Sequence, residues 1–186
     1  MNRFINMISA AMLLIMAVSC LKEKREETYT NQESKIDQYI SSKMYPKGEN
    51  GTDTLRVVYN GGSSRLVLKE GDGDELTSDG TVSFYYAGYT FSGGKSSSGL
   101  FATNHKETAT AAGWNLTDAD YDLLTLEMRD AELLKGLKEG MKGVRSGEHC
   151  EILFSGKYGF GKKPFGIIPA NSALLFEIWV EAVSNE

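Results

Sequence analysis

The sequence has few of the residues that build metal sites and disulfide frameworks. It holds 2 cysteines and 2 histidines among 186 residues. Cys20 and Cys150 are too few for a disulfide framework or a zinc site. His105 and His149 each stand alone in the chain, and a lone histidine is more often a surface or packing residue than a ligand. We therefore expect no metal site.

The sequence also lacks an excess of positive charge. Lysine and arginine number 20 against 25 aspartates and glutamates, which gives a formal net charge of -5. No basic stripe is visible, so we expect no nucleic-acid partner. With 41% hydrophobic and 24% charged residues, the composition is that of a globular protein with one main domain and room for a core.

The beginning of the sequence resembles a bacterial lipoprotein signal. Arg3 precedes an apolar run over residues 8–18, which is too short to span a bilayer comfortably. Small residues stand just before Cys20, as in a lipobox. We predict that residues 1–19 are a lipoprotein signal peptide and that Cys20 carries a lipid. An ordinary secretory signal with an incidental cysteine is the alternative.

The segment after the apolar run is polar and highly charged. Such a run usually stays solvated, so residues 21–31 are expected to be disordered. Residues 34–44 are predicted to form a short helix, and residues 55–59 a strand. The helix places three apolar side chains on one face, namely Ile36, Tyr39 and Ile40. We interpret residues 20–63 as a polar tether with a short helix and a leading strand.

Alternating apolar and polar residues predict a sheet in the rest of the chain. The further strands are expected over residues 66–68, 81–89, 123–128, 148–154 and 173–183. One helix is predicted over residues 130–140, capped by Asp130. Its apolar stripe consists of Leu133, Leu134, Leu137 and Met141. Residues 105–120 are expected to form an irregular surface insertion, and the fold class is α+β, with the sheet packed on that helix.

A loop rich in glycine lies between the last two predicted strands. Glycines and two prolines exclude regular structure over residues 156–169. Four large apolar residues lie in it, namely Phe160, Phe165, Ile167 and Ile168. A loop this apolar is either a flap over an apolar cleft or a long hairpin loop that packs on its own sheet.

Several short motifs in this region, taken together, resemble the FKBP-type peptidyl-prolyl isomerases. They are the stretch over residues 140–148, Tyr158-Gly159-Phe160-Gly161 and Gly166-Ile167-Ile168-Pro169. The resemblance runs from about Arg65 to Val183. The chain as a whole looks similar to membrane-anchored FKBP lipoproteins of Gram-negative bacteria. The resemblance implies an FKBP-like domain over residues 64–184, in which an antiparallel β half-barrel wraps around one short α-helix.

The resemblance implies a pocket between the helix and the sheet. Carried over position by position, the catalytic residues are Tyr86, Phe101, Leu133, Leu134, Leu137, Phe160, Ile167, Ile168 and Phe176. The substrate-binding residues are Ala102, Leu124 and Tyr158. The backbone N–H of Leu134 matches the family's donor to the peptide carbonyl. Similar side chains that we expect to be plain core are Leu126, Leu153 and Ile178.

Three positions depart from the family pattern. Leu137 stands where the family usually has a tryptophan at the pocket floor. Phe160 replaces a tyrosine whose hydroxyl bonds the bound peptide, and Ala102 replaces an aspartate. Phenylalanine keeps the shape of tyrosine but gives up its hydrogen-bond donor. The departures predict an isomerase of reduced activity.

The resemblance implies a prolyl isomerase, or rotamase, that needs no cofactor. Its partners would be proline-containing polypeptide substrates and, through Cys20, a membrane. We expect a monomeric folding helper in the Gram-negative cell envelope, at the periplasmic or surface leaflet of the outer membrane. The alternative is an FKBP-like peptide-binding or chaperone module with weak or no catalysis.

Overall fold

The structure is a computed structural model that describes residues 2–44, 55–129 and 132–185, with side chains from Leu21 onwards. The backbone of the predicted signal peptide is described as helix from Asn2 onwards, whereas its side chains and that of Cys20 lie outside the described part. In the part of the chain that is described, no helix is long and apolar enough to cross a membrane.

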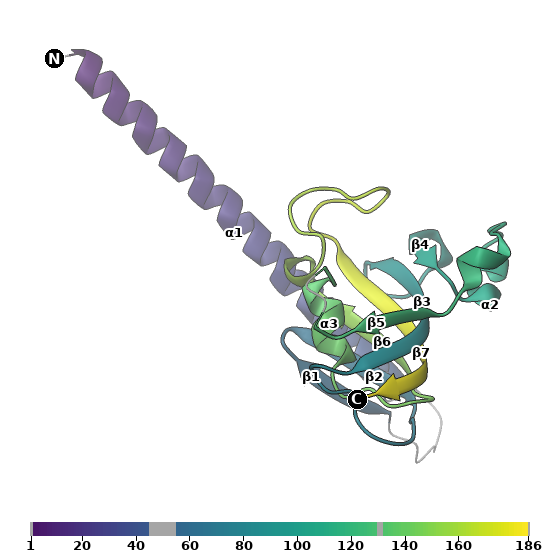
Figure 1. Ribbon diagram of the computed structural model, residues 1–186. Helices are drawn as coiled ribbons and strands as arrows, with labels where there is room; N and C mark the ends of the chain where they lie inside the picture. Colours follow the sequence, from purple (N-terminus) through teal and green to yellow (C-terminus); the bar gives the residue numbers. More distant parts are fainter. Residues whose placement is uncertain (1, 45–54, 130–131, 186) are drawn as a thin grey trace.

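Seven antiparallel strands form one sheet, as Figure 1 shows. The strands are β1 (Arg56–Asn60), β2 (Ser63–Lys69), β3 (Thr81–Phe91), β4 (Leu100–Thr103), β5 (Leu124–Glu127), β6 (His149–Phe154) and β7 (Ala173–Ser184). Their spatial order is β1-β2-β6-β7-β3-β4, and β5 pairs with the beginning of β3. Six of the strands match the segments predicted from alternation. The seventh, β4, is only four residues long and follows a loop of serine and glycine, so it offers little periodic signal.

The inner face of the sheet packs on the short helix α3 (Lys135–Met141). Leu137 and Met141 are buried against side chains of β6 and β7. The largest fully buried members of this core are Phe84, Met128, Met141, Ile152, Phe154, Leu174 and Ile178. The α+β class and the sheet wrapped on one helix are therefore as predicted.

Helix α3 lies very close to the sheet because glycines face it. A Cβ atom on Gly136 would overlap the ring of Phe154, and one on Gly140 would overlap Ile152. Both neighbours are fully buried and have no free space to move into. The two glycines therefore set the distance between the helix and strand β6.

The end of α3 is held by a buried arginine on β2. Arg65 is 2% exposed and donates from Nη1 to the carbonyl oxygens of Gly140 (3.3 Å) and Lys142 (3.0 Å), and from Nη2 to that of Gly143 (3.2 Å). Its Nε lies 3.3 Å from Oε1 of Glu148. Burial raises the pKa of Glu148, and the nearby Arg65 opposes that rise. The cation satisfies carbonyls that the helix end leaves without partners.

The predicted start of this helix is wrong. Residues 130–140 were expected to be helical, but α3 begins at Lys135 with Leu134 in an extended conformation (φ −53°, ψ 132°). The predicted cap, Asp130, lies outside the described residues. Leu133 instead lies in a bend before the helix, where its side chain lines a cavity at the inner face. An apolar stripe in the sequence does not distinguish this arrangement from another helical turn.

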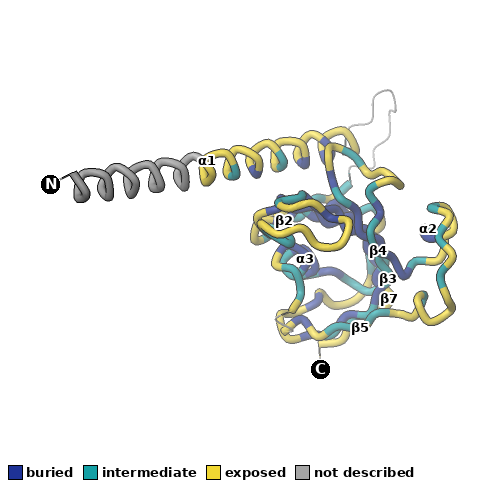
Figure 2. Tube along the Cα trace, turned by 90° about the horizontal axis from the view of Figure 1, so that it is seen from above, coloured by how far each residue is buried: buried dark blue, intermediate teal, exposed yellow. Residues whose placement is uncertain are grey.

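The outer face of the sheet is covered by the long helix α1 (Asn2–Met44). Ile36, Tyr39 and Ile40 are buried against apolar side chains of the sheet. The ring of Tyr39 meets that of Phe91 edge-on at 5.4 Å. Figure 2 shows that buried positions recur on the domain-facing side of this helix. The predicted short helix over residues 34–44 is thus the end of a longer one.

The expectation that residues 21–31 are disordered is wrong, because they belong to α1. Tyr29 is 6% exposed and Gln32 is half-buried. Both side chains continue the stripe that begins with Ile36, since they precede it by seven and four residues. They make polar contacts with the main domain, which a composition rule for disorder does not detect.

A network of charges around the buried Glu151 and Glu177 lies on the outer face beside α1. Lys95 Nζ is 3.0 Å from Glu151 Oε1 and 2.8 Å from Glu177 Oε2, and His149 Nε2 is 3.0 Å from Glu177 Oε1. Tyr39 donates its hydroxyl to Glu151 at 2.9 Å. Burial alone would raise the pKa of Glu177, but the hydrogen bonds from His149 and Lys95 bring it below its ordinary value. Ionised Glu177 therefore favours the folded state, and this contribution is lost as the pH falls through the lowered pKa.

The predicted insertion over residues 105–120 is more ordered than expected. It contains the helix α2 (Lys106–Ala111) and ends in a 3₁₀ turn over Asp118–Tyr121. Ala109 is fully buried, and Trp114 packs against the outer-face core. These two anchors explain the order, whereas the polar surface of the segment predicts irregular structure.

The close approach of α3 makes a prediction about Gly136. Alanine is favoured over glycine inside a helix by about 1 kcal/mol, but Gly136→Ala would force its methyl group into the Phe154 ring. We expect the overlap to prevail and to lower the free energy of unfolding by at least about 1 kcal/mol, as measured by urea denaturation.

Gly94→Ala is the matched control, because a Cβ at Gly94 has no atom within 4 Å. Its free energy of unfolding should stay the same or rise by up to about 1 kcal/mol. If Gly136→Ala is as stable as Gly94→Ala, the glycines do not set the distance between helix and sheet.

Candidate active site

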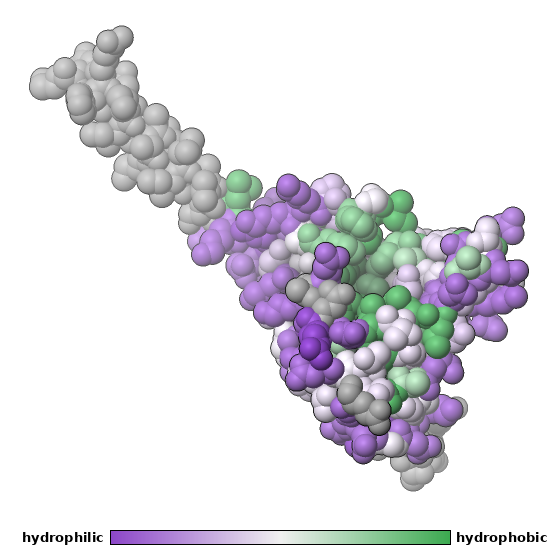
Figure 3. Space-filling view, viewed as in Figure 1, coloured by the Kyte–Doolittle hydropathy of each residue, from purple (hydrophilic) through white to green (hydrophobic). Residues whose placement is uncertain are grey.

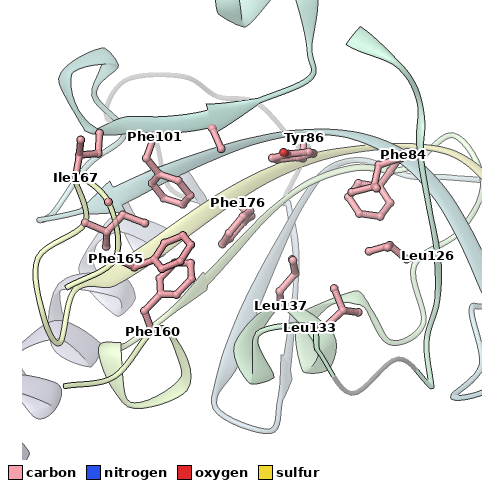
Figure 4. Close-up of a pocket in the computed structure, with 14 residues that line it drawn as sticks. Phe84, Tyr86, Phe101, Leu126, Leu133, Leu137, Phe160, Phe165, Ile167 and Phe176 are labelled. Carbon is pink, nitrogen blue, oxygen red and sulfur yellow. The ribbon is translucent and has the colours of Figure 1, made fainter. Parts of the chain in front are cut away.

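An apolar cavity of about 330 Å³ opens between α3, the inner face of the sheet and the loop over residues 156–169, which we call the flap (Figure 4). None of the 14 residues around it carries a charge, and the hydroxyl of Tyr86 is the only side-chain polar atom in the set. They are Phe84, Tyr86, Phe101, Ala102, Leu124, Leu126, Leu133, Leu137, Phe160, Phe165, Gly166, Ile167, Ile168 and Phe176.

Packed aromatic rings give the cavity its shape. Phe84 and Tyr86 lie two residues apart on β3, so both side chains point to the inner face. Their ring centroids are 6.3 Å apart, at 64°. Phe101 on β4 meets Phe176 on β7 edge-on at 5.7 Å, and Phe176 is in turn stacked on Phe154 at 6.0 Å. Such contacts hold each ring in a defined orientation.

Tyr86 is fixed through its backbone. Its N–H donates to Oδ1 of Asn104 at 2.6 Å, and its carbonyl oxygen accepts from Oγ1 of Thr103 at 2.7 Å. Burial raises the pKa of the Tyr86 hydroxyl. The group therefore stays protonated at neutral pH and is available as a hydrogen-bond donor.

The flap forms one wall of the cavity, as the first of the two interpretations of this loop required. Phe160 and Phe165 stack at 4.6 Å. Phe165 and Ile168 exchange backbone hydrogen bonds of 3.0 and 2.9 Å, which close a turn. Ile168 is buried behind this turn, whereas Phe165 and Ile167 are 62% and 72% exposed. Figure 3 shows apolar surface gathered around the hollow beside the flap.

The structure brings most of the predicted site residues together. Ten of the twelve predicted pocket positions line the cavity: Tyr86, Phe101, Ala102, Leu124, Leu133, Leu137, Phe160, Ile167, Ile168 and Phe176. The individual catalytic and binding roles assigned to them stay predictions.

Two predicted pocket residues have side chains elsewhere. The side chain of Leu134 packs against the inner-face core and does not line the cavity, because this residue caps α3 in an extended conformation. Tyr158 faces away from the cavity, toward the turn at Gly62. The centroid of its ring lies 5.4 Å from Nζ of Lys135 and 5.8 Å from Nζ of Lys157. The resemblance in motifs predicts which positions of the chain lie near the pocket. The direction of each side chain depends on the local backbone conformation, which the motifs do not give.

Sequence reasoning missed four lining residues. Leu126 was expected to be core, together with Leu153 and Ile178, but it lines the cavity while the other two are fully buried. Phe84, Phe165 and Gly166 were not assigned to the pocket. A signal for Phe84 was present, since alternation places it on the same face as Tyr86. Phe165 and Gly166 come from the flap, whose path no periodicity predicts.

Comparison with known proteins agrees with this geometry. A family profile described as "FKBP-type peptidyl-prolyl cis-trans isomerase" matches residues 73–181, more than half of the chain. FK506-binding protein 1 of Aspergillus oryzae is 28% identical over 117 residues, which cover 63% of this chain and 94% of the relative. The FKBP-type peptidyl-prolyl cis-trans isomerase FkpA of Buchnera aphidicola is 23% identical over 175 residues, but this chain covers only 61% of its length.

Solved structures resemble the fold as well. The crystal structure of FkpA from Escherichia coli has a TM-score of 0.54 at 20% identity, over 95% of this chain and 71% of that one. The three FKBP domains of wheat FKBP73 have a TM-score of 0.55 at 18% identity, over 70% of this chain and 51% of that one. Together with the family match, the fold and the cavity lead to one conclusion. The chain belongs to the family of FKBP-type peptidyl-prolyl cis-trans isomerases.

Proposed function

We propose that this protein catalyses cis-trans isomerisation of Xaa-Pro bonds in polypeptides and assists protein folding in the cell envelope of a Gram-negative bacterium. The observation that carries the proposal is the uncharged aromatic cavity beside α3. Its volume of about 330 Å³ is large enough for a prolyl ring and part of the residue before it.

The apolar cavity suits this reaction because rotation needs no bond to break. The barrier to rotation about a peptide bond is about 18–20 kcal/mol, and a tertiary Xaa-Pro amide populates both isomers. Resonance makes the planar amide more dipolar than the twisted one. Removing the amide from water therefore destabilises the planar ground state more than the twisted transition state, and each 1.36 kcal/mol gained in this way accelerates rotation about tenfold.

Two donors can orient the substrate at this site. The protonated Tyr86 hydroxyl lies in the wall of the cavity. The backbone N–H of Leu134 is the donor that the family resemblance assigns to the peptide carbonyl, and it does not depend on the side chain. Leu137, Phe160 and Ala102 contribute no hydrogen bond from their side chains. We therefore propose an enzyme whose rate is modest for its family.

A peptide-binding or chaperone module is the second candidate. It is favoured by the same three positions and by the two exposed apolar residues at the tip of the flap, Phe165 and Ile167. Such a module would hold apolar or proline-containing segments in the cavity without accelerating their isomerisation.

We also propose a cellular setting, from the lipobox-like motif before Cys20. The proposed lipid on Cys20 would attach the protein to the outer membrane of the cell envelope. The helix α1 would connect the lipid to the main domain, and we propose that the protein acts there as a monomer. The small residues before Cys20 and the apolar run over residues 8–18 support the anchor.

The variant Phe160→Tyr tests the enzyme. It keeps the ring and restores the hydroxyl that the family uses to hold the substrate carbonyl. A net hydrogen bond contributes about 0.5–1.5 kcal/mol, so kcat should rise severalfold to tenfold if the bond forms mainly in the twisted state. The measurement is isomerisation of a set of Xaa-Pro peptides by wild type and variant, after thermal melts have established that both are folded.

The two candidate functions give different results in this assay. An unchanged kcat with a lower KM would mean that the new hydroxyl binds ground state and transition state equally. No turnover by either protein, together with measurable peptide binding, would contradict the enzyme and leave the binding module.

The variant Cys20→Ala tests the anchor. Wild type should enter the detergent phase of a two-phase extraction from cells, and Cys20→Ala should move to the aqueous phase, because its attachment chain is missing. Cys150→Ala is the matched control, since this thiol is fully buried and should not influence partitioning. A wild-type protein found in the aqueous phase with an unmodified Cys20 by mass spectrometry would disprove the anchor.

A further inference from the structure

The polar part of the α1 stripe contacts the flap at its two ends. Gln32 donates from Nε2 to the carbonyl oxygen of Asn171 at 2.7 Å. The same side chain accepts from the backbone N–H of Gly156 at 2.9 Å through Oε1. Because an N–H must donate and a carbonyl must accept, these two partners define the orientation of the amide. One side chain thus joins the residue that begins the flap to a residue just beyond its end.

Neighbouring contacts strengthen this connection. Tyr29, one turn earlier on α1, donates its hydroxyl to Oδ1 of Asn171 at 2.8 Å. Ser155 donates to Oε1 of Glu33 at 3.0 Å. Helix α1 therefore holds both ends of the flap through hydrogen bonds from consecutive turns.

The two ends of the flap are also pressed together. A Cβ atom on Gly156 would overlap the backbone of Asn171, so the two ends of the flap leave no room for a side chain at Gly156. Asn171 has φ 57° and is the only described residue other than glycine in the left-handed region. The backbone N–H of Asn171 donates to the carbonyl oxygen of Gly161 at 2.7 Å, across the flap. A left-handed non-glycine residue is retained where surrounding contacts specify its conformation, and here Tyr29 and Gln32 provide two of them.

Farther along the flap, Ile168 and Phe160 pack against the inner-face core, whereas contacts are sparse at the positions between and beside them. Neither Gly161 nor Gly166 would bring a Cβ within 4 Å of another atom, and Ile167 is 72% exposed. The flap nevertheless supplies Phe160, Phe165, Gly166, Ile167 and Ile168 to the wall of the cavity. Figure 1 shows the flap rising beside α1 before it joins β7. The position of this wall therefore depends on how the ends of the flap are held, together with the packing of Ile168 in the core.

We propose that Gln32 is a positioning residue for the isomerase reaction: by joining Gly156 to Asn171, it lets helix α1 set the position of the flap and thereby the shape of the substrate cavity. The proposal rests on the isomerase function proposed above. It makes α1 part of the enzyme, because the helix that covers the outer face of the sheet also positions a wall of the cavity on the inner face.

The test uses the full chain with Gln32→Met, which keeps the length and helix propensity of the side chain but removes both hydrogen bonds. We expect KM for an Xaa-Pro peptide to rise about threefold to tenfold, while kcat falls by less than about twofold, because a loosened flap binds the substrate in fewer of its conformations. Backbone amide exchange of Gly156 and Phe165 should accelerate in the same variant.

Gln38→Met is the matched control. Gln38 lies on the exposed side of the same helix, and within the described part of the chain its side chain bonds to the hydroxyl of Ser34, at 3.3 Å. It should leave KM and flap exchange at their wild-type values. Tyr29→Phe is a milder second variant that removes one hydroxyl, and it should shift KM in the same direction by a smaller factor if Gln32→Met does not fold.

The outcomes separate this proposal from the proposed function. If wild type and Gln38→Met show no turnover, the isomerase fails, and amide exchange together with peptide affinity still tests whether Gln32 positions the flap. If wild type turns over and Gln32→Met matches Gln38→Met in KM, the positioning role is contradicted. Faster exchange of Phe165 with an unchanged KM would contradict it as well, because the flap would then move without affecting the cavity.

Discussion

Strand β7 is buried on both of its faces, and the rest of the structure depends on covering both. Phe176 and Ile178 point to the inner face and are buried with α3. Leu175 points to the outer face and is buried with α1. At about 25 cal/mol per Å² of apolar surface, leaving either face in water would remove a large share of the driving force for folding. One strand therefore requires two helices that lie far apart in the sequence.

The cavity is the part of the inner face that α3 does not cover. The helix is only seven residues long, and its close approach at Gly136 places it over β6 and the neighbouring strand β2. The aromatic surface of β3 and β4 beyond it is covered partly by the flap, and the remaining space is lined by ring faces and aliphatic side chains. An apolar space that persists in a well-packed protein requires such rigid walls. The core and the site thus belong to the same inner face of the sheet. The short helix covers one part of this face and leaves the other part open as the cavity.

Much of this arrangement could be predicted from the sequence, for identifiable reasons. Alternation predicted six strands because their side chains face a core on at least one side, and the motifs around Tyr158 and Ile167 indicated the flap. The polar residues Tyr29 and Gln32 could not be interpreted in that way, because they contact the flap by hydrogen bonds, two of them to backbone atoms, which leave no periodic apolar pattern. The side-chain directions of Leu134 and Tyr158 depend on the local backbone, and sequence spacing does not contain that information.

The sheet separates the two histidines and the network of Lys95, Glu151 and Glu177 from the cavity. Both histidines stack on Trp179 at the outer face, with ring centroids 3.8 Å away for His105 and 5.0 Å for His149. The charged network of Lys95 and Glu177 lies on that side as well. Inside the cavity, the hydroxyl of Tyr86 keeps its proton because burial raises its pKa. Catalysis would then consist of rotation in an apolar space, with no proton transferred in the transition state.

The solvent deuterium isotope effect on the catalysed isomerisation of an Xaa-Pro peptide tests this account most directly. It can be measured by exchange NMR with the full chain in H₂O and D₂O. The account predicts catalysed exchange with a rate ratio of about 1, because no bond to hydrogen is broken or formed. A ratio of about 2 or more, or the absence of catalysed exchange, would contradict it.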